Sequence, residues 1–452
     1  MKIVIVGCGN VGRALVDQLS REEHDIVIID TKATNVSALS SKYDILGIIG
    51  NGASYSTLKE CNIDTADLLI AVTGSDELNL LCCVIAKKAG NCHTIARVRN
   101  PVYRDETEFI RQELGISMIV NPELAAANEI ARLIKYPSAI EVDSFTKEKI
   151  ELLKLKLTSK SKLCNCALKD IKSHTGEDIL ICMVERDDDV MIPDGNFVLK
   201  ENDNISIITS SKGALKFLKK IDFGADRVRS TMIAGGGETT VYLAEQLIAM
   251  GIQVKIIERD PKHCEELCEL LPNAIVINGD GTDKELLEEE GISDIGAFVS
   301  CTNFDEENIL LSLYVKSISQ AKPVTRIHHV NFDKILKNLD IGSVIFPKFI
   351  TAEYILRYVR AMQNSIGSNV ETLYQLIENK VEALEFIVRS DAVNIINKPL
   401  CELKLKDNLL ICCIQHKGKT LTPTGHDIIY PGDTVVVVTT HLGLQDINDI
   451  LK

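Results

Sequence analysis

The sequence predicts an α/β protein in which two Rossmann-like parallel-sheet domains are each followed by a small α+β regulatory domain, in tandem repeat. Three observations support this fold class. A glycine motif follows an apolar run at the N-terminus, apolar runs alternate with helix-like stretches, and the same landmarks return in the second half of the chain. At 452 residues the chain is also too long for one hydrophobic core, so several domains are expected.

The Rossmann-like elements follow from alternation along the first half. Short apolar runs rich in β-branched residues predict strands at Ile3–Val6, Ile26–Ile29, Leu68–Val72, Thr94–Val98 and Met118–Val120. The intervening stretches have helical spacing, which is typical of a parallel sheet flanked by helices. Proline is a good first residue of a helix and opens the predicted helices Pro122–Lys135 and Pro347–Arg360. Their apolar residues fit either a core helix or a helix that packs against another subunit.

A segment of different character follows each Rossmann-like half. Its expected strands are Ile150–Leu157, Asp178–Val184 and Asn204–Ile208. Turn signals separate them at Pro193–Gly195 and Glu201–Asp203, and the second copy has Pro423–Gly425 and Pro431–Asp433 in the same places. The run Lys219–Ser230 would link the repeats. The predicted domains are therefore Rossmann 1–138, small α+β 139–225, Rossmann 226–368 and small α+β 369–452.

The internal repeat is visible in isolated residues as well as in the overall plan. Thr73, Asn79 and Arg97 recur 229 positions later as Thr302, Asn308 and Arg326. The triplet 50–52, Gly-Asn-Gly, recurs at 279–281 as Gly-Asp-Gly with the same offset. So many coincident landmarks are not expected by chance.

The first half carries an intact dinucleotide motif, Gly7-x-Gly9-x-x-Gly12, between a strand and a helix-like run. The glycines permit a tight turn, close approach to a pyrophosphate and close packing of helix on strand. Asp30 ends the next strand, where a carboxylate accepts hydrogen bonds from ribose hydroxyls and repels a 2′-phosphate, so NAD or another adenine nucleotide is favoured over NADP. The predicted first site comprises Gly7, Cys8, Gly9, Asn10, Val11, Asp30, Thr73, Gly74 and Arg97. An unused Rossmann scaffold is the alternative.

The second half carries an altered version of this motif. Thr240 stands in place of the third glycine, where its β-branched side chain is expected to crowd the contact between helix and strand. Glu258 replaces the aspartate and has Arg259 beside it, which could change the nucleotide preference. The predicted second site comprises Gly235, Gly236, Gly237, Glu238, Thr239, Glu258 and Arg326. It is either an altered nucleotide site or a structural relic.

Composition excludes several classes of function. The net charge of −14 and pI of 5.2 argue against nucleic acid and anionic lipid as partners, since both need a basic surface. The N-terminus is expected to be a strand and not a signal peptide, and no apolar run is long enough to span a bilayer. The cysteine spacings predict no metal site. Tyr55 and Lys59 match a dehydrogenase spacing but lie after the third strand, so no catalytic residue is predicted.

Together these motifs resemble the Trk potassium-uptake regulatory (TrkA) family, whose chains are tandems of two KTN/RCK units. The resemblance rests on residues 6–12, Asp30, 50–52, 71–79 and 97–99, with Ile192–Gly195 and Pro431–Asp433 in the small domains. It implies binding of NAD or NADH, with ATP and ADP as alternatives. It also implies a homo-oligomeric ring on the cytoplasmic, inner face of the cell membrane, in contact with a Trk-type potassium-transporter subunit. Two departures are Thr240 and His328, the latter in place of a second Arg99.

The sequence thus favours a non-catalytic, nucleotide-binding cytoplasmic regulatory subunit that gates a membrane potassium uptake transporter. One alternative is an NAD(P)-dependent oxidoreductase, although neither Rossmann half is accompanied by an acid–base group or a substrate domain. Another is a free nucleotide sensor without a membrane partner.

Overall fold

A computed structural model gives the fold of the chain. It describes residues 1–452 except 23, 105, 146–149, 160, 172, 174–175, 177–178, 188, 222–227, 329–338, 340, 365–369 and 378–379. The described residues form two compact units, each assembled from two distant segments. The first unit comprises 1–131 and 229–358, and the second comprises 132–228 and 359–452. The two Rossmann-like domains therefore form one unit and the two small domains form the other. The boundaries of the four predicted domains stay a prediction.

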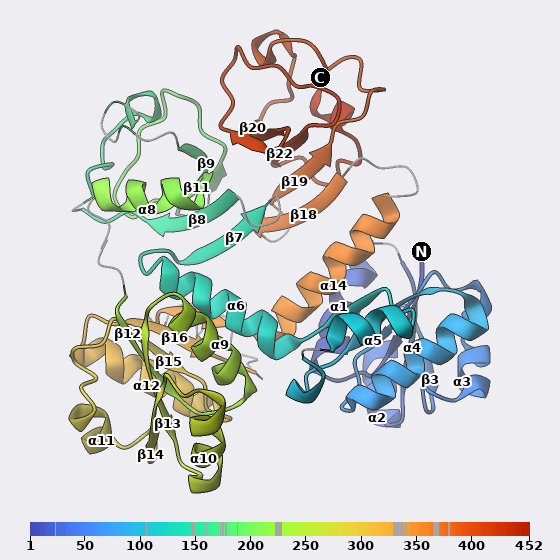
Figure 1. Cartoon of the computed structure of the whole chain (residues 1–452). Helices are drawn as coiled ribbons and strands as arrows, with labels where there is room; N and C mark the ends of the chain where they lie inside the picture. The colour runs from blue at the N-terminus through green and yellow to red at the C-terminus, as the bar shows by residue number, and fades with distance from the viewer. Residues whose placement is uncertain are drawn as a thin grey trace. The chain divides into compact units, whose positions relative to one another are not determined.

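The first half of the first unit, at the blue end of the chain in Figure 1, is a six-stranded parallel sheet. Its strand order is β3-β2-β1-β4-β5-β6. Its strands are β1 Lys2–Val6, β2 Asp25–Asp30, β3 Leu46–Ile49, β4 Leu68–Ala71, β5 His93–Arg97 and β6 Met118–Val120. Its helices are α1 Asn10–Leu19, α2 Ala33–Ser40, α3 Tyr55–Glu60, α4 Asp76–Gly90, α5 Thr107–Glu113 and α6 Pro122–Lys135. The order reverses between β1 and β4, and ligands of such sheets bind beyond the carboxyl ends of the strands at this point.

The second half of this unit repeats the sheet in the order β14-β13-β12-β15-β16-β17. Its strands are β12 Ser230–Ala234, β13 Gln253–Glu258, β14 Ile275–Asn278, β15 Ala297–Ser300, β16 Lys322–Arg326 and β17 Ser343–Ile345. Its helices are α9 Glu238–Ala249, α10 Pro261–Leu270, α11 Lys284–Glu289, α12 Asp305–Ile318 and α14 Pro347–Asn364. The tandem Rossmann-like fold predicted from the glycine motif and the repeat is confirmed.

The second unit holds the two small domains, each with a five-stranded sheet of antiparallel pairs. The first has the order β10-β9-β11-β8-β7, from β7 Glu141–Phe145, β8 Ile150–Lys156, β9 Leu180–Arg186, β10 Asp189–Met191 and β11 Asn204–Ser210, followed by α8 Ser211–Lys220. The second has the order β18-β19-β22-β20-β21, from β18 Val370–Ile377, β19 Val381–Ile387, β20 Leu409–His416, β21 Lys419–Leu421 and β22 Thr434–Thr439. One apolar cluster contains buried residues of both sheets, so the small domains share a core.

Some expected boundaries need correction. The strand expected at Asp178–Val184 is Leu180–Arg186, and Asp178 itself lies outside the described residues, as does half of the expected linker Lys219–Ser230. The helix expected at Pro347–Arg360 extends to Asn364. Periodicity did not predict β7, because its sequence Glu-Val-Asp-Ser-Phe has little apolar content.

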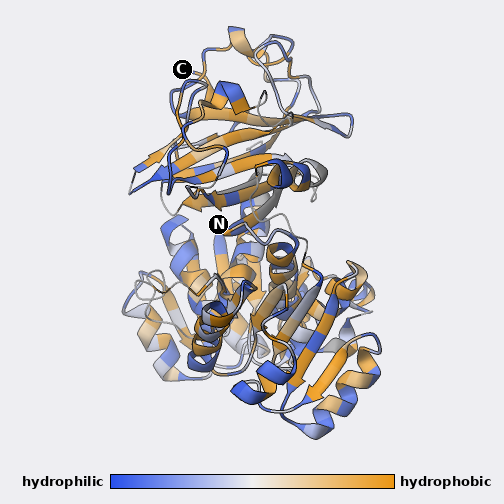
Figure 2. Ribbon diagram, turned by 90° about the vertical axis from the view of Figure 1, so that its left-hand side faces the viewer, coloured by the Kyte–Doolittle hydropathy of each residue, from blue (hydrophilic) through white to orange (hydrophobic). Residues whose placement is uncertain are grey.

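The strands carry the apolar residues and most helices carry polar residues on their outer surfaces (Figure 2). The four residues that end β1 are all buried, as are those of β4. Two-sided burial is expected for a parallel sheet covered by helices on both faces. In the part of the chain that the structure describes, no helix is both long and apolar enough to cross a membrane.

Candidate functional site

The first glycine loop is shaped by two glycines that cannot be replaced. Gly7 has a φ of +100°, and a Cβ there would lie 2.9 Å from the backbone of Val72 and Thr73. A Cβ at Gly12 would lie 2.0 Å from the Gly7 carbonyl oxygen, so only glycine lets α1 approach β1 this closely. Gly9 is different, because no heavy atom lies within 4 Å of where its Cβ would be. Its open side is the place where a phosphate can approach the backbone.

The carboxylate of Asp30 closes this loop from the end of β2. Its two oxygens accept hydrogen bonds from the backbone N–H of Cys8 and of Lys32, each at 2.8 Å. Asn35 Nδ2 lies 3.4 Å from the same carboxylate and Asn35 in turn accepts from Arg13. Burial, with the charge of Asp30, raises the pKa of Cys8 to about 12, so this thiol stays neutral beneath the loop.

The loop after β4 is held by Asn79, a residue that the sequence marked as a repeat landmark without a role. Its Oδ1 accepts from the backbone N–H of Thr73 at 2.8 Å and from the Thr73 hydroxyl at 2.7 Å. Its Nδ2 donates to the Arg97 carbonyl at 2.9 Å, which joins the ends of β4 and β5. Asn308 makes the same three contacts with Thr302 and Arg326 in the second half. The Thr-x5-Asn spacing, present in both repeats, was the signal available in the sequence.

Asp76 and Arg97 continue the edge of the first site. Asp76 begins α4, and its carboxylate accepts from the backbone N–H groups of Arg99 and Asn100 at 2.9 and 2.8 Å. Burial lowers the pKa of Arg97, and the charge of Arg99 adds to this effect. Arg97 Nε is buried without a hydrogen-bond partner. Such an unpaired donor beside a cavity is suited to an anionic group.

These elements enclose a cavity of about 430 Å³. It is lined by eight of the nine predicted residues of the first site, Gly7, Gly9, Asn10, Val11, Asp30, Thr73, Gly74 and Arg97. Cys8, the ninth, is buried and contributes its backbone N–H to Asp30. Tyr55 and Lys59 do not line the cavity, and Lys59 Nζ lies 5.2 Å from the centre of the exposed Tyr55 ring. The binding role of the lining residues stays a prediction.

The second glycine loop keeps the same backbone. Gly235 has a φ of +104°, and the Glu258 carboxylate accepts from Gly236 N–H at 2.8 Å and Asp260 N–H at 2.9 Å. The longer glutamate therefore makes the same pair of bonds as Asp30. The expected crowding by Thr240 is not observed, because its buried side chain donates a hydrogen bond to the Gly235 carbonyl at 2.7 Å.

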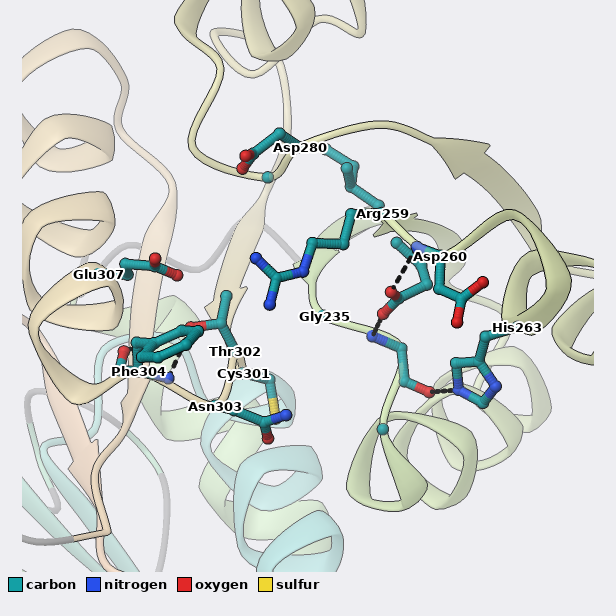
Figure 3. A pocket seen from close by; sticks show the side chains of 15 residues that line it. Gly235, Arg259, Asp260, His263, Asp280, Cys301, Thr302, Asn303, Phe304 and Glu307 are labelled. Atoms are coloured by element: carbon teal, nitrogen blue, oxygen red, sulfur yellow. Dashed lines mark hydrogen bonds between the residues drawn. The ribbon is translucent and has the colours of Figure 1, made fainter.

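The second cavity is smaller, about 250 Å³, and differs in its lining (Figure 3). Of the predicted residues, Gly235, Gly236, Gly237 and Glu258 line it, whereas Glu238, Thr239 and Arg326 do not. The lining residues that the predicted second site did not include are Ile257, Arg259, Asp260, His263, Asp280, Gly281, Cys301, Thr302, Asn303, Phe304 and Glu307. Figure 3 shows Arg259 extending between Asp280 on one side and Phe304 and Glu307 on the other.

Charged residues of the first Rossmann half act on Glu238. Burial raises its pKa, and so does the charge of Glu123, while Arg99 and Arg97 oppose the shift. Helix α9 makes further contacts in the same direction, since Tyr242 accepts from Asn121 at 3.1 Å. Helix α9 is therefore part of the contact between the halves, and Glu238 at its start does not line the second cavity.

Among the described residues, no group of three or more His, Cys, Asp or Glu side chains is placed to hold a metal ion. The geometry instead offers two backbone loops, each paired with a carboxylate at the end of the neighbouring strand. This arrangement fits a nucleotide, whose phosphates approach the loop and whose ribose approaches the carboxylate.

Comparison with known proteins agrees with this geometry. The TrkA-N domain family matches residues 3–122 and 231–347, and the TrkA-C domain family matches 152–222 and 384–452. The chain belongs to the TrkA family. A "Trk system potassium uptake protein TrkA homolog 1" of Methanosarcina mazei is 32% identical over the full length of both chains. A TrkA homolog of Archaeoglobus fulgidus is 31% identical, also over both full lengths, and TrkA of Haemophilus influenzae is 29% identical over 97% of this chain and 95% of that one.

Solved structures show the same fold. The GsuK channel superposes with a TM-score of 0.64 at 18% identity, covering 97% of this chain and 76% of that chain. A structure described as the GsuK channel bound to NAD gives 0.62 with the same identity and coverage. The tandem arrangement of Rossmann-like and small domains is thus shared with these structures.

Proposed function

We propose that the chain is a nucleotide-binding regulatory subunit that gates a membrane potassium uptake transporter of the Trk type. It would act as a homo-oligomeric ring, peripheral on the cytoplasmic face of the membrane. Relatives across the full length are named as potassium uptake proteins of the Trk system. The observation that carries the proposal is the first cavity, where an open glycine loop, Asp30 and Arg97 come together.

In this proposal the first site binds NAD or NADH, with ATP and ADP as competing ligands. The pyrophosphate would lie on the Gly9 side of the loop, where the backbone is open, and the ribose would approach Asp30. Arg97 would bind a phosphate oxygen or the distal half of the ligand. Ligand binding shifts a conformational equilibrium only by its differential affinity for the two states, so occupancy would bias the ring toward one shape.

The test combines binding with transport. Potassium uptake is measured in cells that lack their own regulator and express the transporter subunit with wild-type chain, Gly9→Val or Asp30→Ala. We expect the wild-type chain to support uptake that responds to nucleotide, and both variants to lose this response. If the Gly9→Val chain still co-purifies with the transporter subunit, the lost response is a loss of gating and not of assembly. If potassium uptake is the same with each of the three proteins, the proposal is contradicted. If the wild-type chain does not co-purify with the transporter subunit, the free nucleotide sensor is favoured.

The second candidate function is an NAD(P)-dependent oxidoreductase. The feature that it shares with the regulatory subunit is the proposed binding of NAD. The ionisable side chains that line the first cavity are Asp30, Lys32 and Arg97, and Asp30 is already bonded to two backbone N–H groups. We expect purified protein with NADH and carbonyl acceptors to show no turnover. Steady NADH oxidation that is lost on Tyr55→Phe would restore the catalytic hypothesis.

A further inference from the structure

The two Rossmann sites share their central part but differ at both ends. The glycine loop and the carboxylate that closes it have the same geometry in each half, with φ near +100° and two backbone N–H groups on the carboxylate. Any ligand of either site can therefore place a ribose and the first phosphate in the same way. The rest of the ligand meets different surroundings.

The distal end of the second site is closed. In the first cavity Val11 and Arg97 are part of the lining. Their counterparts, Thr239 and Arg326, do not line the second cavity. Arg326 Nη1 donates to the Thr239 hydroxyl at 3.1 Å, and Nη2 lies 3.4 Å from the Thr302 carbonyl. The guanidinium is therefore held beneath the loop, and the space that a second nucleotide would need is not part of the cavity.

At the opposite end of the second site, planar side chains stand where the first site has small ones. Arg259 and Phe304 stand where the first site has Thr31 and Ser75. The guanidinium carbon of Arg259 lies 5.7 Å from the centre of the Phe304 ring, and both groups border the cavity (Figure 3). Aromatic rings and guanidinium planes stack on nucleobases without requiring a particular hydrogen-bond pattern. Asp280, on the other side of Arg259, offers a carboxylate to an exocyclic amino group.

The charge of the two sites also differs in sign. The first cavity is lined by one carboxylate, Asp30, and two cations, Lys32 and Arg97. The second is lined by four carboxylates and by two basic residues, Glu258, Asp260, Asp280, Glu307, Arg259 and His263. A triphosphate is repelled by such a site more strongly than a single phosphate, because it carries more negative charge.

From these differences we propose that the second site selects a purine mononucleotide, with the base stacked between Arg259 and Phe304, and excludes dinucleotides and triphosphates. This inference rests on the proposed nucleotide-binding function and adds the ligand class of the second site. The ligand occupies only the central part of the site. Its base lies between Arg259 and Phe304, in place of their direct contact. Its single phosphate binds on the Gly237 side of the loop. Like Gly9, Gly237 has no heavy atom within 4 Å of where a Cβ would be.

The test uses the full chain with the first site blocked by Gly9→Val, a change that the open space at Gly9 allows without disturbing the fold. Calorimetric titration with AMP, NAD and ATP is expected to show AMP binding once per chain, at least about tenfold tighter than either of the others. Adding Phe304→Ser, the first-site residue at that position, should weaken AMP at least about tenfold. NAD binding as tight as AMP in the Gly9→Val chain would overturn the inference.

Two further variants separate the causes of the selectivity. Glu307→Gln removes one lining carboxylate and should strengthen ATP relative to adenosine, whereas Glu306→Gln, an exposed neighbour outside the cavity, should not. Thr239→Val places the first-site residue beneath the loop, frees Arg326 Nη1 and should strengthen NAD relative to AMP. Equal ATP-to-adenosine ratios in both glutamine variants would contradict the charge argument.

The outcome also distinguishes this inference from the proposed function. If the wild-type chain binds NAD, Gly9→Val abolishes that binding, and no AMP binds, only the inference about the second site fails. If the wild-type chain binds no nucleotide at all, the proposed function fails as well.

Discussion

The two Rossmann halves have the same strand order, and yet one site is open where the other is closed. In the first half Gly12 has no side chain and Val11 has no hydroxyl, so neither residue can donate a side-chain hydrogen bond to the loop. In the second half Thr240 bonds to the loop from within and Thr239 holds Arg326 beneath it. A duplicated fold can thus keep its backbone while a few hydroxyl groups change which part of the site is accessible. The loop geometry alone does not reveal this difference.

The largest effect is expected when the third position of the motif is exchanged between halves. Gly12→Thr puts a Cβ within 2.0 Å of the Gly7 carbonyl oxygen, a backbone atom that cannot move away. We expect it to destabilise the first Rossmann half by more than about 3 kcal/mol. Thr240→Gly loses one hydrogen bond and helix propensity and should cost about 1–2 kcal/mol. Denaturant unfolding followed by circular dichroism compares them, and equal losses would show that the loops tolerate the same residues.

The small domains offer a second matched pair. Arg186 donates two hydrogen bonds to the fully buried carboxylate of Asp203, at 2.7 and 2.8 Å, and His416 makes one contact of 2.6 Å with Asp433. Arg186→Ala leaves a buried carboxylate without its cation and should cost about 3 kcal/mol. We expect His416→Ala to cost less, because one bond is lost in place of two. A larger loss for His416→Ala would show that the pairing geometry does not set the stability.

Burial opposes the low pKa of Asp203, but its hydrogen bonds to Arg186 and to the backbone of Lys200 prevail and lower it below the ordinary value. A carboxyl whose pKa is lower in the folded state stabilises the fold above its unfolded pKa of about 3.9. That contribution is lost as the pH falls through the folded pKa. Acid titration of stability should therefore be less steep below about pH 4 in Arg186→Ala than in the wild-type chain, and identical curves would contradict the pairing.

The first residue of the fifth strand also differs between halves. The first half has the exposed His93 there, and the second has the partly buried Lys322, whose pKa burial lowers to about 8, with a smaller contribution from Lys316. The cost of burying this charge is complete below pH 8 and disappears as the pH approaches the unfolded value of about 10.4. Lys322→Met should therefore stabilise the protein by about 1–3 kcal/mol at pH 7 and less at pH 9.5. A difference in melting temperature that stays constant with pH would contradict this.

The smallest effect is expected at the contact between the halves. Arg104 and Glu245 form an ion pair of 2.8 Å, but both side chains are 39% exposed. Exposed pairs contribute little because water and salt screen them, so Arg104→Ala should change stability by less than about 1 kcal/mol. Thermal unfolding of Arg104→Ala beside Glu245→Ala measures this, and a loss well above that value would mean that the halves depend on this contact.

Much of the fold could be predicted because its signals are local. The spacing from Gly12 to Asp30, and from Thr240 to Glu258, fixes the strand–helix–strand unit, and the structure places both carboxylates on their loops. The sequence could not show that Glu238 lies outside the second cavity, or that Arg326 is buried, because these depend on packing between distant elements. The grouping of like domains is of the same kind, since it joins segments far apart in the chain.

The central claim is that one chain holds two nucleotide sites of different kinds. Equilibrium dialysis of the full chain with labelled NAD measures it directly, with Gly9→Val and Gly237→Val as a matched pair of blocked sites. We expect one NAD per chain, absent in Gly9→Val and retained in Gly237→Val, because only the first cavity extends to Arg97. Two equivalent NAD molecules per chain, with each variant losing one of them, would contradict it.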